Sequence, residues 1–124
     1  MSYQLNWEPK GVFWKYNGDV TGQEIIDATS QIYGDARFDD LKYKIVDFLA
    51  VNSIKMGESD IALIAYQHKA AELSNPSVKT AILIERGNRY VEQFVSFFKD
   101  STWEVEVFEN ENDANIWLKR KPNE

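Results

Sequence analysis

One short segment constrains the fold more than any other part of the chain. Residues 81–84 read Ala-Ile-Leu-Ile, an apolar run without alternation inside a strand-like stretch, residues 78–85. A strand that is apolar on both sides is typical of a parallel sheet whose two faces are covered by helices. The run is also far shorter than the ~20 apolar residues that a membrane-spanning helix needs. We therefore predict an α/β fold with residues 81–84 in the centre of the sheet.

Apolar residues that alternate with polar ones predict further strands on either side of this run. These strands are expected in residues 3–8, 12–16, 43–48 and 102–108. The first two are separated by a Pro/Gly turn at residues 9–11, which is typical of an antiparallel hairpin. Glu104 and Glu106 lie on the outer face of the last strand. Charge there favours a position at the edge of the sheet.

Helical spacing of apolar residues predicts helices between the later strands and after the last one. The pattern Thr21-x-x-Glu24 is a capping box that opens the first helix, and Gly34 is expected to end it. Ser59 or Asp60 is expected to cap the second helix.

The connections follow from composition. Residues 17–19 are Asn-Gly-Asp and are expected to break the second strand, and residues 35–40 and 51–58 are expected to form polar loops. The resulting order is β-β-α-β-α-β-α-β-α. We therefore expect one domain over residues 1–124, with a five-stranded mixed sheet and right-handed crossovers.

This order of elements resembles the SpoIIAA-like (STAS) fold. The resemblance rests on the hairpin of residues 3–16, on Gly-Asp-Val-Thr at residues 18–21 before the first helix, and on the strand at residues 44–48 with its following loop. It implies a non-enzymatic domain that binds a protein partner in bacterial regulation, with self-association as a homodimer. The alternative is a carrier or sensor of a small apolar or lipid-like ligand.

The resemblance also directs attention to the segment after the third strand. Signalling members of the family carry Asp-Ser-(Ser/Thr)-Gly there and are phosphorylated on a serine, whereas residues 51–60 read Val-Asn-Ser-Ile-Lys-Met-Gly-Glu-Ser-Asp. Because the motif is missing, no phosphorylated serine is predicted. Loops at strand carboxyl ends nevertheless carry the binding residues of α/β sheets. The candidate partner- or ligand-binding residues are therefore Asn52, Ser53, Lys55, Met56, Glu58, Ser59 and, within or at the end of the strand, Asp47.

Charge and composition disfavour several other functions. The 124 residues include 20 acidic and 14 basic side chains, for a net charge of −6, whereas nucleic-acid binding normally needs a concentrated basic face. The basic cluster at residues 119–121 is expected to complement the last helix dipole or to form a solvated tail. The chain has no cysteine, which excludes thiolate metal sites and disulfides. No glycine-rich phosphate loop follows a strand, so no cofactor is predicted.

His68 has no second histidine at i+4 and is expected to be a packed or surface residue rather than a catalytic or metal-binding one. The N-terminus shows no basic start followed by an apolar stretch, so cytoplasmic residence without stable membrane insertion is expected.

The third helix carries an apolar stripe wider than one packed face needs, which indicates a further partner surface. That stripe comprises Tyr90, Val91, Phe94, Val95, Phe97 and Phe98.

Overall fold

The computed structural model describes residues 3–88, 91–96, 98 and 100–120. Its strands are β1 (Tyr3–Trp7), β2 (Gly11–Thr21), β3 (Tyr43–Lys55), β4 (Lys79–Leu83) and β5 (Glu104–Phe108). Its helices are α1 (Gly22–Tyr33), the 3₁₀ helix η1 (Ala36–Asp40), α2 (Glu58–Ser74), α3 (Val91–Ser96) and α4 (Glu111–Leu118). No helix in the described part of the chain is both long enough and apolar enough to cross a membrane.

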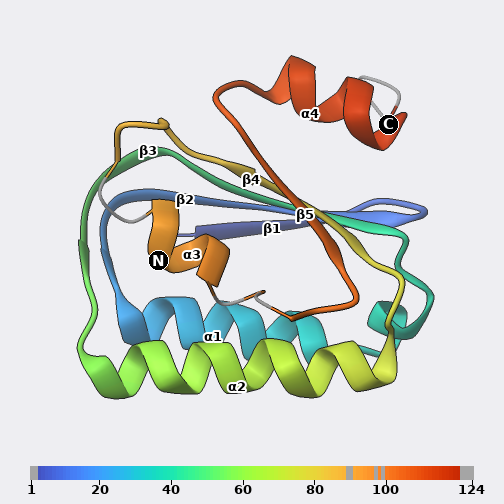
Figure 1. Cartoon of the computed structure of the whole chain (residues 1–124), viewed down its shortest axis with the longest axis horizontal. Helices are drawn as coiled ribbons and strands as arrows, with labels where there is room; N and C mark the ends of the chain where they lie inside the picture. Colours follow the sequence, from blue (N-terminus) through green and yellow to red (C-terminus); the bar gives the residue numbers. More distant parts are fainter. Residues whose placement is uncertain (1–2, 89–90, 97, 99, 121–124) are drawn as a thin grey trace.

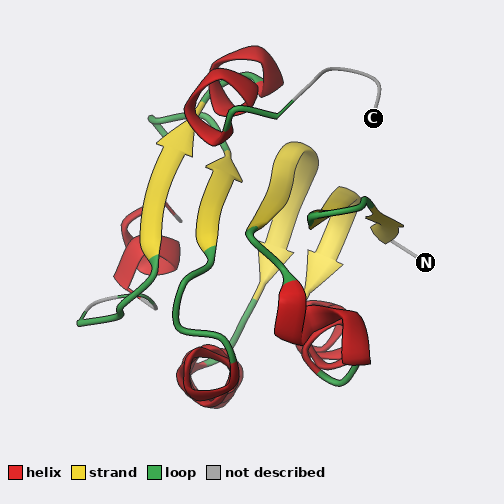
Figure 2. Cartoon of the chain, turned by 90° about the vertical axis from the view of Figure 1, so that its right-hand side faces the viewer, coloured by secondary structure: helices red, strands yellow, loops and turns green. Residues whose placement is uncertain are grey.

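The strands form one five-stranded sheet in the order β1-β2-β3-β4-β5. β1 pairs with β2 in antiparallel register, and the other neighbouring strands run parallel. The predicted order of elements and the mixed sheet are therefore confirmed. The α4 helix covers one face of the sheet, and α1 and α2 cover the other (Figures 1 and 2).

The two faces of the sheet bury separate apolar clusters. The larger cluster, which we call the main core, lies on the side of α1 and α2 and includes Trp14 from β2 and Ile32 from α1. The smaller one lies beneath α4 and includes Ala114, with Phe13 of β2 packed against it. Trp14 and Phe13 of β2 therefore face opposite sides of the sheet, and Phe13 contributes to the core under α4.

β4 contributes side chains to both clusters, as the unbroken apolar run predicted. Ala81 and Leu83 belong to the cluster under α4, and Ile82 and Ile84 belong to the larger one. The strand lies between β3 and β5, so its interior position is confirmed, although β3 is the middle strand. The prediction that the glutamate-bearing strand β5 forms an edge is also confirmed.

Strands β2 and β3 are longer than predicted. Residues 17–19 do not break β2, because the ladder to β3 continues through register shifts between Lys15 and Asn17 and between Gly18 and Asp19. Gly18 has φ +71°, a conformation that a residue without a side chain adopts without strain. The expected loop after residue 50 is also wrong up to Lys55, because that segment is paired with the second half of β2.

Two local expectations about helix starts are corrected as well. Residues 35–40 are not a loop: Asp35 caps η1 by accepting from the Arg37 amide, and Phe38 is buried. The N-cap of α2 is Gly57 rather than Ser59 or Asp60, and the Asp60 carboxylate accepts from the Gly57 amide at 3.1 Å.

The capping box that opens α1 is confirmed. The Thr21 side chain accepts from the Glu24 amide, and the Glu24 carboxylate accepts from the Thr21 amide.

A buried ion pair joins the first hairpin to the segment after α4. Arg120 donates to both carboxylate oxygens of Glu8, at 2.8 and 2.5 Å, and the two side chains are 7% and 1% exposed. The same guanidinium donates to Glu111 at 3.1 Å and to Asn115 at 2.6 Å, and the Tyr43 hydroxyl donates to Glu8. Burial acts to raise the pKa of Glu8, but the hydrogen bonds from Arg120 and Tyr43 outweigh it and lower that pKa.

This cluster corrects the expectation for residues 119–121. Arg120 is neither a dipole partner nor a solvated side chain but the buried partner of a carboxylate that lies far away in the sequence. Lys119 ends α4 in the left-handed region, with φ 57°, and Lys121 lies outside the described residues.

Candidate functional site

All of the predicted site residues except Asp47 gather at one end of the sheet. β2 and β3 bend there and lead into α1 and α2 (Figure 1). Asn52, Ser53 and Lys55 lie on the last part of β3 and are exposed, as are Glu58 and Ser59 in the first turn of α2. Met56, between the two elements, packs partly against the main core.

The chemistry of this end is polar and acidic. The Ser53 hydroxyl donates to Asp19 at 2.8 Å and ties the two bent strands together. The starts of α1 and α2 are already capped by Glu24 and Asp60. Because these carboxylates occupy the helix N-termini, an added anion there would meet like charge. The charges at the helix starts therefore disfavour the binding of a phosphate group there.

Asp47 does not join the other candidates. It lies five residues before Asn52, or about 16 Å along a strand, and its carboxylate accepts from the Leu49 amide at 2.8 Å. Burial raises the pKa of Asp47, and this outweighs the opposing effects of the Leu49 amide and of Lys15. Its side chain lies on the face of the sheet that α4 covers, away from the other candidates.

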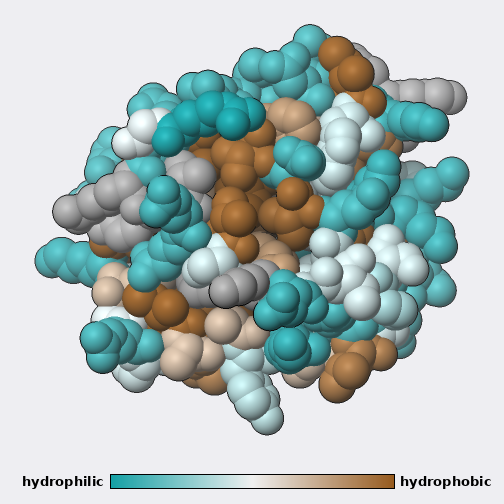
Figure 3. Space-filling view, viewed as in Figure 1, coloured by the Kyte–Doolittle hydropathy of each residue, from teal (hydrophilic) through white to brown (hydrophobic). Residues whose placement is uncertain are grey.

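The outer face of α2 exposes a line of apolar side chains. Leu63, Tyr66, Ala70 and Leu73 recur at helical spacing, and we call them the outer stripe. The large members are 46%, 74% and 86% exposed, in that order, whereas Ile64, His68 and Ala71 on the opposite face are buried. Brown and tan side chains are interspersed with paler ones along the lower border of Figure 3, where α2 runs in Figure 1. Ser59 lies one turn before Leu63 on the same face, so the stripe is continuous with the predicted site.

The structure tests the aromatic stripe of the third helix only in part. Tyr90 and Phe97 lie outside the described residues, as do the side chains of Val91 and Phe94. Val95 is 42% exposed, whereas Phe98 packs against the main core.

A chain of buried polar groups crosses the main core. The Lys44 ammonium group donates to the Tyr33 hydroxyl at 2.5 Å, and that hydroxyl lies 2.5 Å from Nδ1 of His68. Lys44 has no carboxylate partner among the described residues, and its Nζ lies 4.2 Å from the centre of the Trp103 ring. Burial lowers the pKa of Lys44 well below its usual value. Burial and, to a smaller extent, the charge of Lys44 also lower the pKa of His68.

His68 is therefore packed, as predicted, but it does not lack a polar neighbour. Tyr33 and Lys44 come from other elements, so the residue spacing around His68 does not indicate them. No group of metal-ligating side chains occurs in the described ranges.

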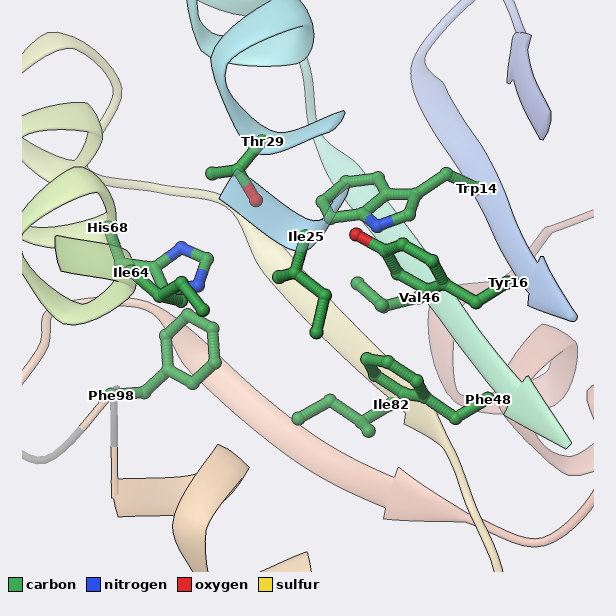
Figure 4. Close-up of a pocket in the computed structure, with 10 residues that line it drawn as sticks. All are labelled: Trp14, Tyr16, Ile25, Thr29, Val46, Phe48, Ile64, His68, Ile82 and Phe98. Atoms are coloured by element: carbon green, nitrogen blue, oxygen red, sulfur yellow. The ribbon is translucent and has the colours of Figure 1, made fainter. Parts of the chain in front are cut away.

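A small apolar cavity lies beside this polar chain (Figure 4). Its volume is about 30 Å³. Its walls are formed by Trp14, Tyr16, Ile25, Thr29, Val46, Phe48, Ile64, His68, Ile82 and Phe98. Pockets that bind drug-sized ligands have volumes of roughly 300 Å³ or more. The described residues therefore leave room for a few atoms rather than for a lipid tail.

Comparisons with known proteins identify the fold. No protein-family model matches the chain, and no curated protein does so either. A SpoIIAA-like protein of the DUF3478 family from Shewanella loihica PV-4 aligns with a TM-score of 0.59 and 14% identity, covering 94% of this chain and 93% of that one. The anti-sigma factor antagonist SpoIIAA in its unphosphorylated form also aligns with a TM-score of 0.59 and 14% identity, covering 95% and 97%. The chain therefore has a SpoIIAA-like fold, as predicted.

Proposed function

We propose that this chain is a non-enzymatic regulatory domain of the cytoplasm that binds a protein partner through the outer stripe of α2 and the adjoining end of β3. The observation that carries the proposal is the exposure of Leu63, Tyr66 and Leu73 along one helix face. On a fully solvated helix that face would carry charged side chains. The likeness to an anti-sigma factor antagonist supports a partner that is itself a protein.

The predicted site residues form the polar border of this surface. Lys55 and Glu58 are exposed beside the N-terminal end of the stripe, and Met56 offers an adaptable apolar contact. An apolar centre with a charged border is the common arrangement of protein interfaces. The partner we propose therefore presents an apolar helix or groove flanked by charge.

Leu73→Glu is expected to weaken partner binding by at least about tenfold, because full burial of a leucine contributes about 1.5–3 kcal/mol. The side chain is already 86% exposed, so the melting temperature should stay nearly unchanged. The partner is first identified as a protein that cross-links to the wild-type chain in cells. Titration calorimetry with the purified partner then measures the affinity.

Ile116→Glu is the matched control for this experiment. Ile116 is an aliphatic side chain, 70% exposed, on α4 at the other face of the sheet. Binding of the partner should be unaffected by this change. If the Leu73 and Ile116 variants bind the partner as tightly as the wild type, the outer stripe is not the interface.

Lys55→Glu and Glu58→Lys are each expected to weaken binding about fivefold, because charges at an interface border steer association and fix register. Neither residue is buried, so the free energy of unfolding should change by less than about 0.5 kcal/mol. Glu104→Lys on the edge strand β5 is the control and should bind normally. Equal affinities for all these variants would remove the end of β3 from the proposed site.

A second candidate function, the binding of a small apolar ligand, rests on the cavity beside His68. Its apolar walls favour such a ligand, but its volume of about 30 Å³ restricts the occupant to a small molecule. Native mass spectrometry of the protein purified from cells measures retained mass directly. Retention of a lipid would show that the cavity opens beyond its present size.

A further inference from the structure

The two edges of the sheet differ in how they are protected from pairing with another strand. β5 carries Glu104 and Glu106, which are exposed, and such charges discourage edge-to-edge association. β1 reads Tyr-Gln-Leu-Asn-Trp and has neither a charge nor a proline. It forms the border of the sheet, and no described element lies outside it (Figure 2). Within the described residues, nothing therefore pairs with the outer edge of β1.

The backbone of β1 presents hydrogen-bonding groups outward at defined positions. Glu8 and Gly11 exchange both of their backbone hydrogen bonds across the turn, at 2.8 and 3.4 Å. Hydrogen-bonded and non-bonded pairs alternate along an antiparallel ladder. Tyr3, Leu5 and Trp7 therefore form the non-bonded pairs with β2, and their N–H and C=O groups point away from it.

The strand is self-complementary about Leu5. If two β1 strands pair antiparallel around a twofold axis at this residue, Leu5 faces Leu5 of the second copy, and each Tyr3 faces a Trp7. Gln4 and Asn6 then face each other on the other side of the sheet. The pairing therefore matches aromatic with aromatic and amide with amide, and such cross-strand pairs stabilise a sheet. The outward-pointing backbone groups are also the ones that this register joins.

The surface beside β1 can accommodate a second strand. A hollow of about 690 Å³ borders Gln4 and Asn6 and is completed by Phe13, Lys15 and Gln31 among others. None of its lining residues is acidic, although the chain has a net charge of −6. Like-charge repulsion between two copies is therefore not expected from the residues that line this hollow.

From these observations we propose that the chain forms a symmetric homodimer by antiparallel pairing of two β1 strands, which joins the two sheets into one. This interface is distinct from the outer stripe of α2. α1 lies beneath the side of the sheet that carries β1, whereas α2 lies farther from that edge (Figure 2). The dimer leaves both outer stripes exposed and presents two copies of the partner surface.

A charge exchange on the exposed face of β1 tests this pairing. Gln4→Glu/Asn6→Glu places two pairs of like charges across the twofold axis and is expected to raise the dimer dissociation constant about tenfold or more. Gln4→Lys/Asn6→Lys should do the same. An equal mixture of the two variants should form a heterodimer, because every facing pair then carries opposite charges. Sedimentation velocity over a concentration series measures all three samples, with Asn112→Glu on α4 as a control that remains dimeric.

Amide hydrogen exchange locates the interface. In the wild-type dimer the amides of Tyr3, Leu5 and Trp7 should become protected as the concentration rises, and this protection should be lost in Gln4→Glu/Asn6→Glu. The amides of Gln4 and Asn6 bond to β2 and should be protected in the monomer as well.

Three results would each overturn the proposal. One is a wild-type chain that remains monomeric at about 1 mM, where even weak association of about −4 kcal/mol is detected. Another is a dimer that the charged variants leave intact. The third is a mixture of the two variants that stays monomeric. None of these results bears on partner binding by α2, which the Leu73 variant tests separately.

Discussion

Arg120→Ala is expected to lower the free energy of unfolding by about 3–5 kcal/mol, the usual cost of removing one member of a buried ion pair. The change leaves the Glu8 carboxylate, whose side chain is 1% exposed, without its bidentate partner. It also removes the hydrogen bonds that Arg120 donates to Glu111 and Asn115 of α4. Urea denaturation followed by tryptophan fluorescence measures the change.

The pH dependence of the free energy of unfolding distinguishes the effect of losing the ion pair from the effect of losing packing. In the wild type the pKa of Glu8 is lowered, so its stabilising contribution is present above the unfolded pKa of about 4.3 and is lost as the pH falls through the folded pKa. In Arg120→Ala burial raises that pKa instead, so the variant should gain stability relative to the wild type as the pH falls from 7 to 4.

A double variant provides the matched control. Glu8→Gln/Arg120→Met removes both charges and should be more stable than Arg120→Ala at pH 7, because no buried charge remains unpaired. If the double variant is less stable than the single one, the loss of stability in Arg120→Ala comes from lost packing and not from the unpaired Glu8 carboxylate.

Lys44→Met is expected to raise the free energy of unfolding by about 2–4 kcal/mol at pH 7, because an ion in a protein interior costs several kcal/mol without a counter-charge. Lys44 is 0% exposed. Its described favourable contacts are a hydrogen bond to Tyr33 and the faces of nearby aromatic rings such as Trp103. Methionine keeps a flexible apolar stem, and Tyr33 keeps its contact with His68.

The gain should depend on pH with a defined sign. The folded pKa of Lys44 is lowered, so protonation of the unfolded chain destabilises the wild type below the unfolded pKa of about 10.4. The advantage of Lys44→Met should therefore shrink as the pH rises from 7 to 10. Lys42→Met, at an exposed position two residues earlier, should change stability by less than about 0.5 kcal/mol. A destabilised Lys44→Met would show that the lysine is retained for its hydrogen bond.

The fold could be predicted from the sequence where local pattern determined structure. The alternation in β1, the apolar run in β4 and the capping box at Thr21 each depend on neighbouring residues, and each was placed correctly. The second half of β3 could not be predicted, because Asn52, Ser53 and Lys55 are polar and favour a loop on their own. They are held in a strand by pairing with the second half of β2. That half of β2 is itself hard to predict, because Asn-Gly-Asp at residues 17–19 is typical of a turn.

For the candidate site, the sequence indicated only a position at one end of the sheet, where six of the seven predicted residues gather. The outer stripe does have a signal in the sequence. The apolar residues of α2 lie on every side of the helix rather than on one face, so some of them must remain exposed when the other face packs against the core. Lys44 and Arg120 carried no such signal. A lysine at the start of a strand and an arginine near a helix end are ordinary surface residues until distant elements enclose them.

The contact between Glu8 and Arg120 spans 112 residues of sequence and therefore has a consequence for synthesis. As the chain leaves the ribosome, the first hairpin emerges early, whereas its arginine partner emerges after every strand has been made. Until then the Glu8 carboxylate remains hydrated, and the face of the sheet that α4 later covers stays open. We therefore expect docking of α4 to be the last step in maturation, and a nascent chain stalled before residue 120 to expose that apolar face to chaperones.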